Sequence, residues 1–260
     1  MTSRPFACRS RLLCGAFLLS VLVLVYACSP ADKPHSAAIA SAHPLATQAG
    51  MDILDAGGNA FDAAVTVSAV LAVVEPYSSG IGGGGFWLLH RSSDGFEVMV
   101  DGRERAPLAA HRDMYLDDAG NVIADLSVDG ALAAGIPGEP AALVHIARNY
   151  GRLPLAQTLA AAIRLAREGF PVDEHYRRMA GFRLEALQED AVAAGIFLVD
   201  DAVPDAGVLI VQPDLAETLE NIAQHGHDGF YTGTVAERLV EGVRAVDGIW
   251  TMEDLSLIHI

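Results

Sequence analysis

Four consecutive glycines at positions 82–85 and an arginine at position 103 are the residues whose types and spacing best suit chemistry. Glycine loses more backbone freedom on folding than any other residue, so a run of glycines indicates that a ligand or another chain segment lies against the backbone. Arg103 follows within the charged segment 101–105. A guanidinium presents planar, permanently charged donors that match a carboxylate. Together these residues predict a site for a small anionic substrate.

The glycine run has a nucleotide-binding and a structural interpretation. Gly80, Gly82 and Gly85 match the spacing of the dinucleotide fingerprint. That fingerprint needs a strand before the glycines and a helix after them. Here a predicted helix precedes the run and a predicted strand follows it, which argues against a nucleotide site. The structural interpretation is a tight passage between a buried helix and a central strand, which is compatible with a nearby substrate.

The charged segment 101–105 also allows a purely local interpretation. Arg103 and Arg105 alternate with Asp101 and Glu104, a pattern typical of surface ion pairs that contribute little to stability. In an extended segment the two arginines would share one face and Glu104 would take the other. If only one arginine faces a substrate, the other should be paired elsewhere.

Other polar clusters predict no catalytic centre. The sequence His-Gly-His-Asp at 225–228 resembles a metal cluster, but it coincides with a predicted helix end, where histidine favours the helix dipole. Ser78 and Ser79 lie in a turn without a base-type partner, and the chain has no Gly-x-Ser-x-Gly elbow. The residues alone therefore indicate an anion site without a visible nucleophile.

The elements that must position these residues are mainly helices. The segment 60–74 is apolar on nearly every side, which predicts a buried helix, and Asn59 with Asp62 predicts its capping box. Gly151, Gly169 and Gly226 stand where C-terminal caps belong. Residues 201–211 are predicted to form a surface excursion. The predicted helices are 45–55, 60–74, 139–150, 155–168, 173–189, 214–225 and 235–246, and the predicted strands are 86–90 and 96–101.

Composition and length limit the class of protein. The chain has 260 residues, of which 52% are hydrophobic, so it can form one large globular domain or two small ones. Its formal net charge of −16 argues against nucleic acid as a partner.

The first residues have the features of a targeting segment. Three arginines precede the apolar stretch 12–25, which predicts a signal peptide over residues 1–27. The sequence Val-Tyr-Ala-Cys ending at Cys28 resembles a bacterial lipobox, so Cys28 is predicted to be lipidated, and 28–43 to be a tether. A simple signal-peptidase cut is the alternative. The protein is expected on the periplasmic side of the outer membrane, held only by a lipid anchor, or soluble in the periplasm. No cysteine follows Cys28, so the body has no disulfide or thiolate nucleophile.

Several sequence blocks in order resemble the heavy chain of the γ-glutamyltranspeptidase family. The resemblance covers residues from about 40 to 255. Its blocks are Ala-Thr-Gln-Ala-Gly at 46–50, Gly-Gly-Asn-Ala-Phe-Asp-Ala-Ala at 57–64, the glycine run through Phe86, Asp-Gly-Arg-Glu-Arg-Ala-Pro at 101–107, Gly-Ile-Pro-Gly at 135–138 and Asp-Gly-Phe-Tyr-Thr-Gly at 228–233.

This resemblance implies an α/β (α+β) fold of the N-terminal-nucleophile hydrolase type, an αββα sandwich that is incomplete here. Members are precursors that cut themselves before a threonine, which then attacks the γ-glutamyl amide of glutathione, with its own amino group able to act as base. Water or an amino acid accepts the γ-glutamyl group. The resemblance assigns the substrate's α-carboxylate to Arg103 and gives Arg105 no role. The freed light chain is the expected partner, and the resemblance implies no metal or organic cofactor.

The chain also departs from the family pattern. Nothing matches the light-chain threonine motif, and Thr234 and Thr251 lie in helix-entry contexts. Residues 44–254 are therefore expected to be a truncated large-subunit region, inactive and prone to aggregation by itself. Residues 255–260 are expected to be a non-native tail, because they can be back-translated to a transposon end used in sequencing libraries. Two alternatives remain: a glutaryl- or cephalosporin-type acylase, and a non-catalytic anion-binding lipoprotein.

Overall fold

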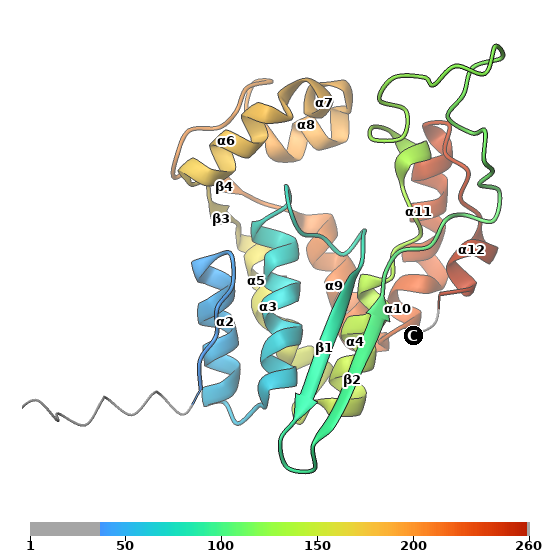
Figure 1. Cartoon of the computed structure of the whole chain (residues 1–260). Coiled ribbons are helices and arrows are strands. Elements are labelled where there is room, and N and C mark those ends of the chain that lie inside the picture. Colours follow the sequence, from blue (N-terminus) through green and yellow to red (C-terminus); the bar gives the residue numbers. More distant parts are fainter. Residues whose placement is uncertain (1–36, 259–260) are drawn as a thin grey trace, which may run out of the picture. The chain divides into compact units, whose positions relative to one another are not determined.

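The alanine- and valine-rich helix predicted to be buried, α3 (Ala60–Val74), lies in the core of the computed structural model (Figure 1). Val65, Ala69 and Val70 on this helix are fully buried. It packs against three other helices: α2 (Pro44–Asp55), α4 (Glu139–Tyr150) and α5 (Leu155–Glu168). Because its neighbours lie on several sides, α3 needs no polar face, as its sequence predicts.

The structure describes residues 37–258, and those from Ile39 onward belong to one compact unit. The predicted signal peptide 1–27, the predicted lipidation site Cys28 and most of the tether lie outside the described residues. No helix within 37–258 is long and apolar enough to cross a membrane.

The N-terminus of α3 is closed by the predicted capping box. The side chain of Asn59 accepts hydrogen bonds from the backbone of Phe61 and Asp62, and the Asp62 carboxylate accepts one from the Asn59 backbone at 2.8 Å. Asp62 is fully buried and also accepts from the backbone N–H groups of Arg152 at 3.0 Å and Leu153 at 3.3 Å. The cap of one helix thereby fastens the turn between α4 and α5.

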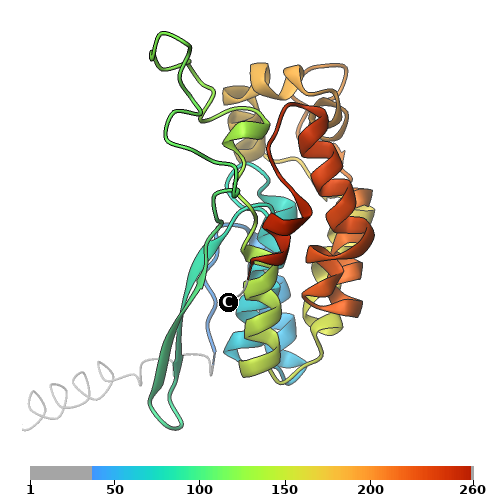
Figure 2. The same cartoon turned by 90° about the vertical axis from the view of Figure 1, so that its right-hand side faces the viewer.

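The second half of the chain adds further helices to this core. Helix α9 (Pro213–His225) packs on α5 and ends at Gly226, whose φ of +67° matches the predicted glycine cap. The short α10 (Asp228–Tyr231), α11 (Gly233–Ala245) and α12 (Met252–Ser256) follow. Figure 2 shows α11 and α12 in red beside the core helices.

The two predicted strands form an antiparallel hairpin. Strand β1 (Gly85–Arg91) pairs with β2 (Phe96–Gly102), with Leu88 opposite Met99. One face carries Trp87, Leu89, Val98 and Val100 toward the core, where β2 packs on α4. Side chains on the other face point away from that core, because successive residues of a strand alternate.

The helices between α5 and α9 differ from the prediction. The predicted helix 173–189 is two helices, α6 (Glu174–Phe182) and α7 (Leu184–Glu189), because Arg183 has a non-helical backbone with φ −110° and ψ 15°. Helix α8 (Ala191–Phe197) was not expected. The predicted surface excursion 201–211 is mostly exposed, as expected, but it contains β4 (Leu209–Ile210), which pairs with β3 (Phe170–Pro171) and buries Ile210.

Candidate functional site

The glycine run packs directly onto the segment that carries Arg103. A Cβ added to Gly84 would lie 2.3 Å from the carbonyl oxygen of Gly102 and 2.7 Å from the Cα of Arg103. Side chains added at Gly82 and Gly83 would meet nothing within 4 Å. The prediction that another chain segment approaches the glycine backbone is therefore confirmed at Gly84.

The turn before α4 holds the same segment from the other side. A Cβ on Gly138 would lie 2.3 Å from the carbonyl oxygen of Arg103. The backbone N–H groups of Gly138 and Glu139 both donate to the carbonyl oxygen of Gly83, at 2.9 and 3.0 Å. Three backbone segments, around residues 83, 103 and 138, thus meet at distances that side chains would prevent.

A cavity of about 600 Å³, here called the glycine pocket, opens beside this junction. Two acidic side chains, Glu104 and Glu139, contribute to its wall. The full lining is Ser68, Pro76, Tyr77, Ser78, Ser79, Gly80, Gly82, Gly83, Gly84, Gly85, Phe86, Trp87, Glu104 and Glu139. The glycines leave their backbone accessible from this pocket, which is the arrangement that a close-fitting small ligand requires.

Arg103 adjoins the glycine pocket without lining it. Its Nη2 lies 2.9 Å from Oε1 of Glu104, and the two side chains are 50% and 30% exposed. The guanidinium also lies over the ring of Phe86, with 5.9 Å between Cζ and the ring centroid. An ion pair this exposed contributes only about 0–1 kcal/mol, so the Arg103 side chain can exchange Glu104 for another carboxylate at small cost.

The expectation that Glu104 points away from both arginines is wrong. Strand β2 ends at Gly102, so the alternation of an extended strand does not continue through residues 103 and 104. Arg105 instead forms a bridge with Ile136, and its Nη1 donates to the carbonyl oxygen of Leu257 at 3.2 Å. Of the two arginines, Arg105 is therefore the one engaged elsewhere in the fold.

Glu139 is the polar residue of the pocket that sequence reasoning missed. It begins α4, is only 7% exposed, and its Oε1 accepts a hydrogen bond from Ser68 Oγ at 2.8 Å. Burial raises the pKa of the Glu139 carboxyl, and the Ser68 hydrogen bond offsets part of that rise. An acid in the first turn of a helix is so common that its type and position carried no signal of burial.

Two further polar atoms at the pocket are buried without a hydrogen-bond partner among the described residues. They are Nε1 of Trp87 and Oε2 of Glu104. Buried polar atoms are satisfied in the great majority of native structures. Both atoms belong to residues that line the glycine pocket, so these residues carry one donor and one acceptor without a partner in the described part of the chain.

The histidines at 225 and 227 take structural positions. His225 lies in the last turn of α9, as predicted. His227 stacks on the ring of Tyr231, with 4.4 Å between ring centroids, and its Nε2 lies 3.2 Å from the carbonyl oxygen of Ile258. Thr251 caps α12 in a capping box with Asp254, and Thr234 lies in the first turn of α11, so both threonines have the helix-entry contexts predicted for them.

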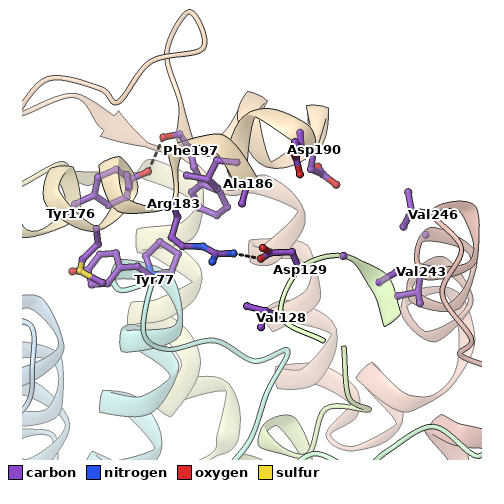
Figure 3. Close-up of a pocket in the computed structure, with 18 residues that line it drawn as sticks. Tyr77, Val128, Asp129, Tyr176, Arg183, Ala186, Asp190, Phe197, Val243 and Val246 are labelled. Atoms are coloured by element: carbon purple, nitrogen blue, oxygen red, sulfur yellow. Dashed lines mark hydrogen bonds and ion pairs between the residues drawn. The ribbon is translucent and has the colours of Figure 1, made fainter. Parts of the chain in front are cut away.

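A second cavity, of about 820 Å³, lies between the helices α6–α8 and the loop 128–131 (Figure 3). Its lining is largely apolar and includes Tyr176, whose hydroxyl donates to the carbonyl oxygen of Phe197 at 2.8 Å. An ion pair between Arg183 and Asp129 crosses it. Tyr77 lines both cavities, but neither Arg103 nor the glycine run contributes to this one.

Comparison with known proteins assigns the family. The family model described as gamma-glutamyltranspeptidase matches residues 46–259. The chain belongs to this family. The glutathione hydrolase proenzyme of Escherichia coli is 41% identical over 219 residues, covering 84% of this chain and 38% of the relative. That of Pseudomonas sp. strain A14 is 38% identical over 248 residues, covering 95% and 43%. The chain spans about two fifths of the length of these curated relatives.

Solved structures agree with the family assignment. The γ-glutamyltranspeptidase of Helicobacter pylori superposes with a TM-score of 0.84 at 38% identity, covering 88% of this chain and 66% of that one. A cephalosporin acylase from Bacillus halodurans gives a TM-score of 0.74 at 29% identity, covering 89% and 46%. The predicted fold class is confirmed: this is a helix-rich α+β part of an N-terminal-nucleophile hydrolase, with few strands among residues 37–258.

Proposed function

We propose that this chain is the large-subunit region of an exported glutathione hydrolase or γ-glutamyltransferase precursor. In this proposal Arg103 binds the α-carboxylate of the γ-glutamyl substrate at the mouth of the glycine pocket. The observation that carries it is the backbone junction around Gly84 and Gly138, which holds the Arg103 backbone beside the pocket. The guanidinium itself remains half exposed. The family match and the relatives named glutathione hydrolase proenzyme support the proposed activity.

The test is Arg103→Ala in the complete protein that carries this chain, with Arg105→Ala as the matched control. Loss of a charge-assisted, bidentate contact should raise the KM for a γ-glutamyl anilide by about 100-fold. Arg105→Ala should change KM by less than about threefold, because Arg105 pairs through its backbone with Ile136 and has no substrate contact in this proposal. An unchanged KM in Arg103→Ala would remove Arg103 from the substrate site.

The nucleophile in this proposal is a threonine of the light chain, released when the precursor cuts itself. Its hydroxyl attacks the γ-glutamyl amide, and water or an amino acid then accepts the γ-glutamyl group. The 260-residue chain alone is expected to be inactive, since it lacks that threonine motif. Turnover of a γ-glutamyl anilide by the purified 260-residue chain would contradict this. Reading the gene past the codon for Leu255 tests for a downstream threonine motif.

The hairpin supports association with a light chain. Phe86, Leu88 and Met99 on its outer face are 62%, 85% and 61% exposed. Among the described residues, β1 and β2 pair only with each other. Two-stranded sheets are marginal by themselves, and an apolar outer face requires a cover. The light chain is the proposed cover.

Export and anchoring are also proposals. A signal peptide over 1–27 and acylation at Cys28 would place the protein on the periplasmic side of the outer membrane. Cys28→Ser should abolish incorporation of labelled palmitate while leaving export intact. Normal labelling of Cys28→Ser would exclude acylation at this residue, and export without any labelling of the wild type would favour the soluble periplasmic form.

An acylase remains the second candidate, because the cephalosporin acylase of Bacillus halodurans superposes on this chain. A glutaryl amide has the terminal carboxylate of a γ-glutamyl amide but no α-amino group. A higher kcat/KM for the γ-glutamyl than for the glutaryl amide would support the proposal, and the reverse order would support an acylase. Absence of turnover with both would favour a non-catalytic anion-binding lipoprotein.

A further inference from the structure

Tyr231 is a buried polar side chain that has no role in the proposed function. It lies in the block 228–233, is 1% exposed, and ends α10. Its hydroxyl donates to the carbonyl oxygen of Pro137 at 2.8 Å and accepts from the backbone N–H of Ala141 at 3.2 Å. One side chain thus bridges the turn before α4 and the first turn of that helix.

The bridged turn is the same turn that holds the backbone of Arg103. Gly138 lies against the carbonyl oxygen of Arg103, and Arg105 and Ile136 exchange two backbone hydrogen bonds, at 3.0 and 2.7 Å. Pro137 lies between these two contacts. A displacement of the Pro137 carbonyl would therefore move the backbone on both sides of Arg103.

The surroundings of Tyr231 keep its hydroxyl protonated and fix the position of its ring. Burial raises the pKa of the phenol, so it stays protonated and can donate to Pro137 throughout the physiological range. The ring is held between His227, stacked at 4.4 Å, and Phe230, edge-on at 4.9 Å. With its ring packed and its hydroxyl bonded twice, Tyr231 has a defined position relative to the turn.

We propose that Tyr231 is a positioning residue that sets the orientation of Arg103 toward the substrate's α-carboxylate. It acts through the turn 136–139 and does not contact substrate. The inference rests on the proposed role of Arg103. Removal of the hydroxyl would free the Pro137 carbonyl, loosen the turn and misplace the guanidinium, and a small displacement of a binding group is enough to weaken transition-state contacts.

The experiment compares two substrates in the complete protein. A γ-glutamyl anilide carries the α-carboxylate, and a 4-aminobutyryl anilide lacks it, so the ratio of their kcat/KM values measures the contribution of that group. Tyr231→Phe should lower this ratio about fivefold to tenfold, with little change for the 4-aminobutyryl substrate. Arg103→Ala should lower it about 100-fold, and the double variant should equal Arg103→Ala alone.

Tyr176→Phe is the matched control. Tyr176 is 2% exposed and also donates to a backbone carbonyl, that of Phe197, but it belongs to α6 and touches neither the turn nor Arg103. Its loss should destabilise the protein to a similar degree while changing the substrate ratio less than about twofold. A merely structural role of Tyr231 would produce the same pattern as this control.

The outcomes separate the two proposals. If Arg103→Ala lowers the ratio and Tyr231→Phe does not, the positioning role is overturned and the proposed function stands. If Arg103→Ala leaves the ratio unchanged, the proposed role of Arg103 fails and this inference fails with it. Should Tyr231→Phe not fold, His227→Ala, which removes the stacked ring, should lower the ratio about twofold to threefold, and an unchanged ratio there would also overturn the inference.

Discussion

The helical core and the hairpin with its following loop differ in how much of their apolar surface is covered by the rest of the chain. In the core, α3 is covered by α2, α4 and α5, and its N-terminus is closed by the side chains of Asn59 and Asp62. In the hairpin, one face packs on α4 while the other exposes Phe86, Leu88 and Met99. The loop that follows exposes Val122 and Val128 as well, at 77% and 63%.

This difference shows where the chain is self-sufficient. The core satisfies its backbone and its apolar surface with its own residues. The hairpin and the glycine pocket have unsatisfied atoms and an open apolar face, which are features of a surface that another chain completes. The glycine run and Arg103 lie in the hairpin region, close to the helical core.

Charged residues on the outer face of the hairpin are expected to have the largest effect, because they would remove the apolar surface that distinguishes the hairpin from the core. Leu88→Lys with Met99→Glu places opposite charges on a cross-strand pair, so the hairpin itself should persist. In the complete protein this double variant should abolish association with the light chain, as measured by co-purification and maturation on gels. In the isolated 260-residue chain it should reduce aggregation measured by light scattering.

The exposed Val192 on α8 offers the control for the hairpin variant. Val192 is 69% exposed, and Val192→Lys should leave light-chain association intact. Normal association of the charged hairpin would show that this face is not the one that the light chain covers.

Asp62→Ala tests the self-sufficiency of the core. It leaves the partly buried backbone N–H groups of Asn59, Arg152 and Leu153 without their acceptor. The expected loss in the free energy of unfolding is about 3–5 kcal/mol, measured by urea unfolding. Asp52→Ala, which removes only an exposed hydrogen bond with Gln48, should cost less than about 0.5 kcal/mol. Similar values for both variants would refute the fastening role of Asp62.

Gly84→Ala and Gly82→Ala test the close backbone packing between the glycine run and the segment that carries Arg103. The added methyl group at Gly84 collides with the backbone of Gly102 and Arg103, whereas at Gly82 it meets nothing within 4 Å. Gly84→Ala should cost about 1–3 kcal/mol of stability and weaken substrate binding, and Gly82→Ala should leave stability nearly unchanged. Thermal unfolding and KM measured on both variants would decide whether close backbone approach explains the glycine run.

Glu139→Gln is expected to give the smallest effect, visible mainly as a change in pH dependence. A carboxyl with a raised pKa holds its proton more tightly in the folded state, so stability falls as pH rises from the usual glutamate range through the raised pKa. Glu139→Gln keeps an acceptor for Ser68 and should flatten that fall. Ser68→Ala removes a hydrogen bond that lowers the pKa and should steepen it. Urea midpoints over a pH series would show no difference if Glu139 is not responsible.

The sequence predicted helices well where the signals are local. Helix α3 begins at its predicted cap and ends at Val74, and α4 and α5 have their predicted bounds. Prediction failed at a residue that makes a contact with a distant part of the chain. Arg183 interrupts the helix predicted over 173–189, and its side chain pairs with Asp129 in a loop 54 residues away. Nothing within the local sequence signals that pair.

The sequence by itself determined the helical core, the hairpin, the family and the prediction of Arg103 as a substrate-binding residue. Caps, periodicity and family motifs depend on residues that are close together in the sequence. Only the tertiary structure decided how the pocket is built. Glu139 meets Ser68 across 71 positions, and Tyr231 reaches Pro137 across 94. The burial of one carboxyl and the bridging of one turn depend on which segments pack together. That packing is a property of the whole chain, so no local pattern could have specified either contact.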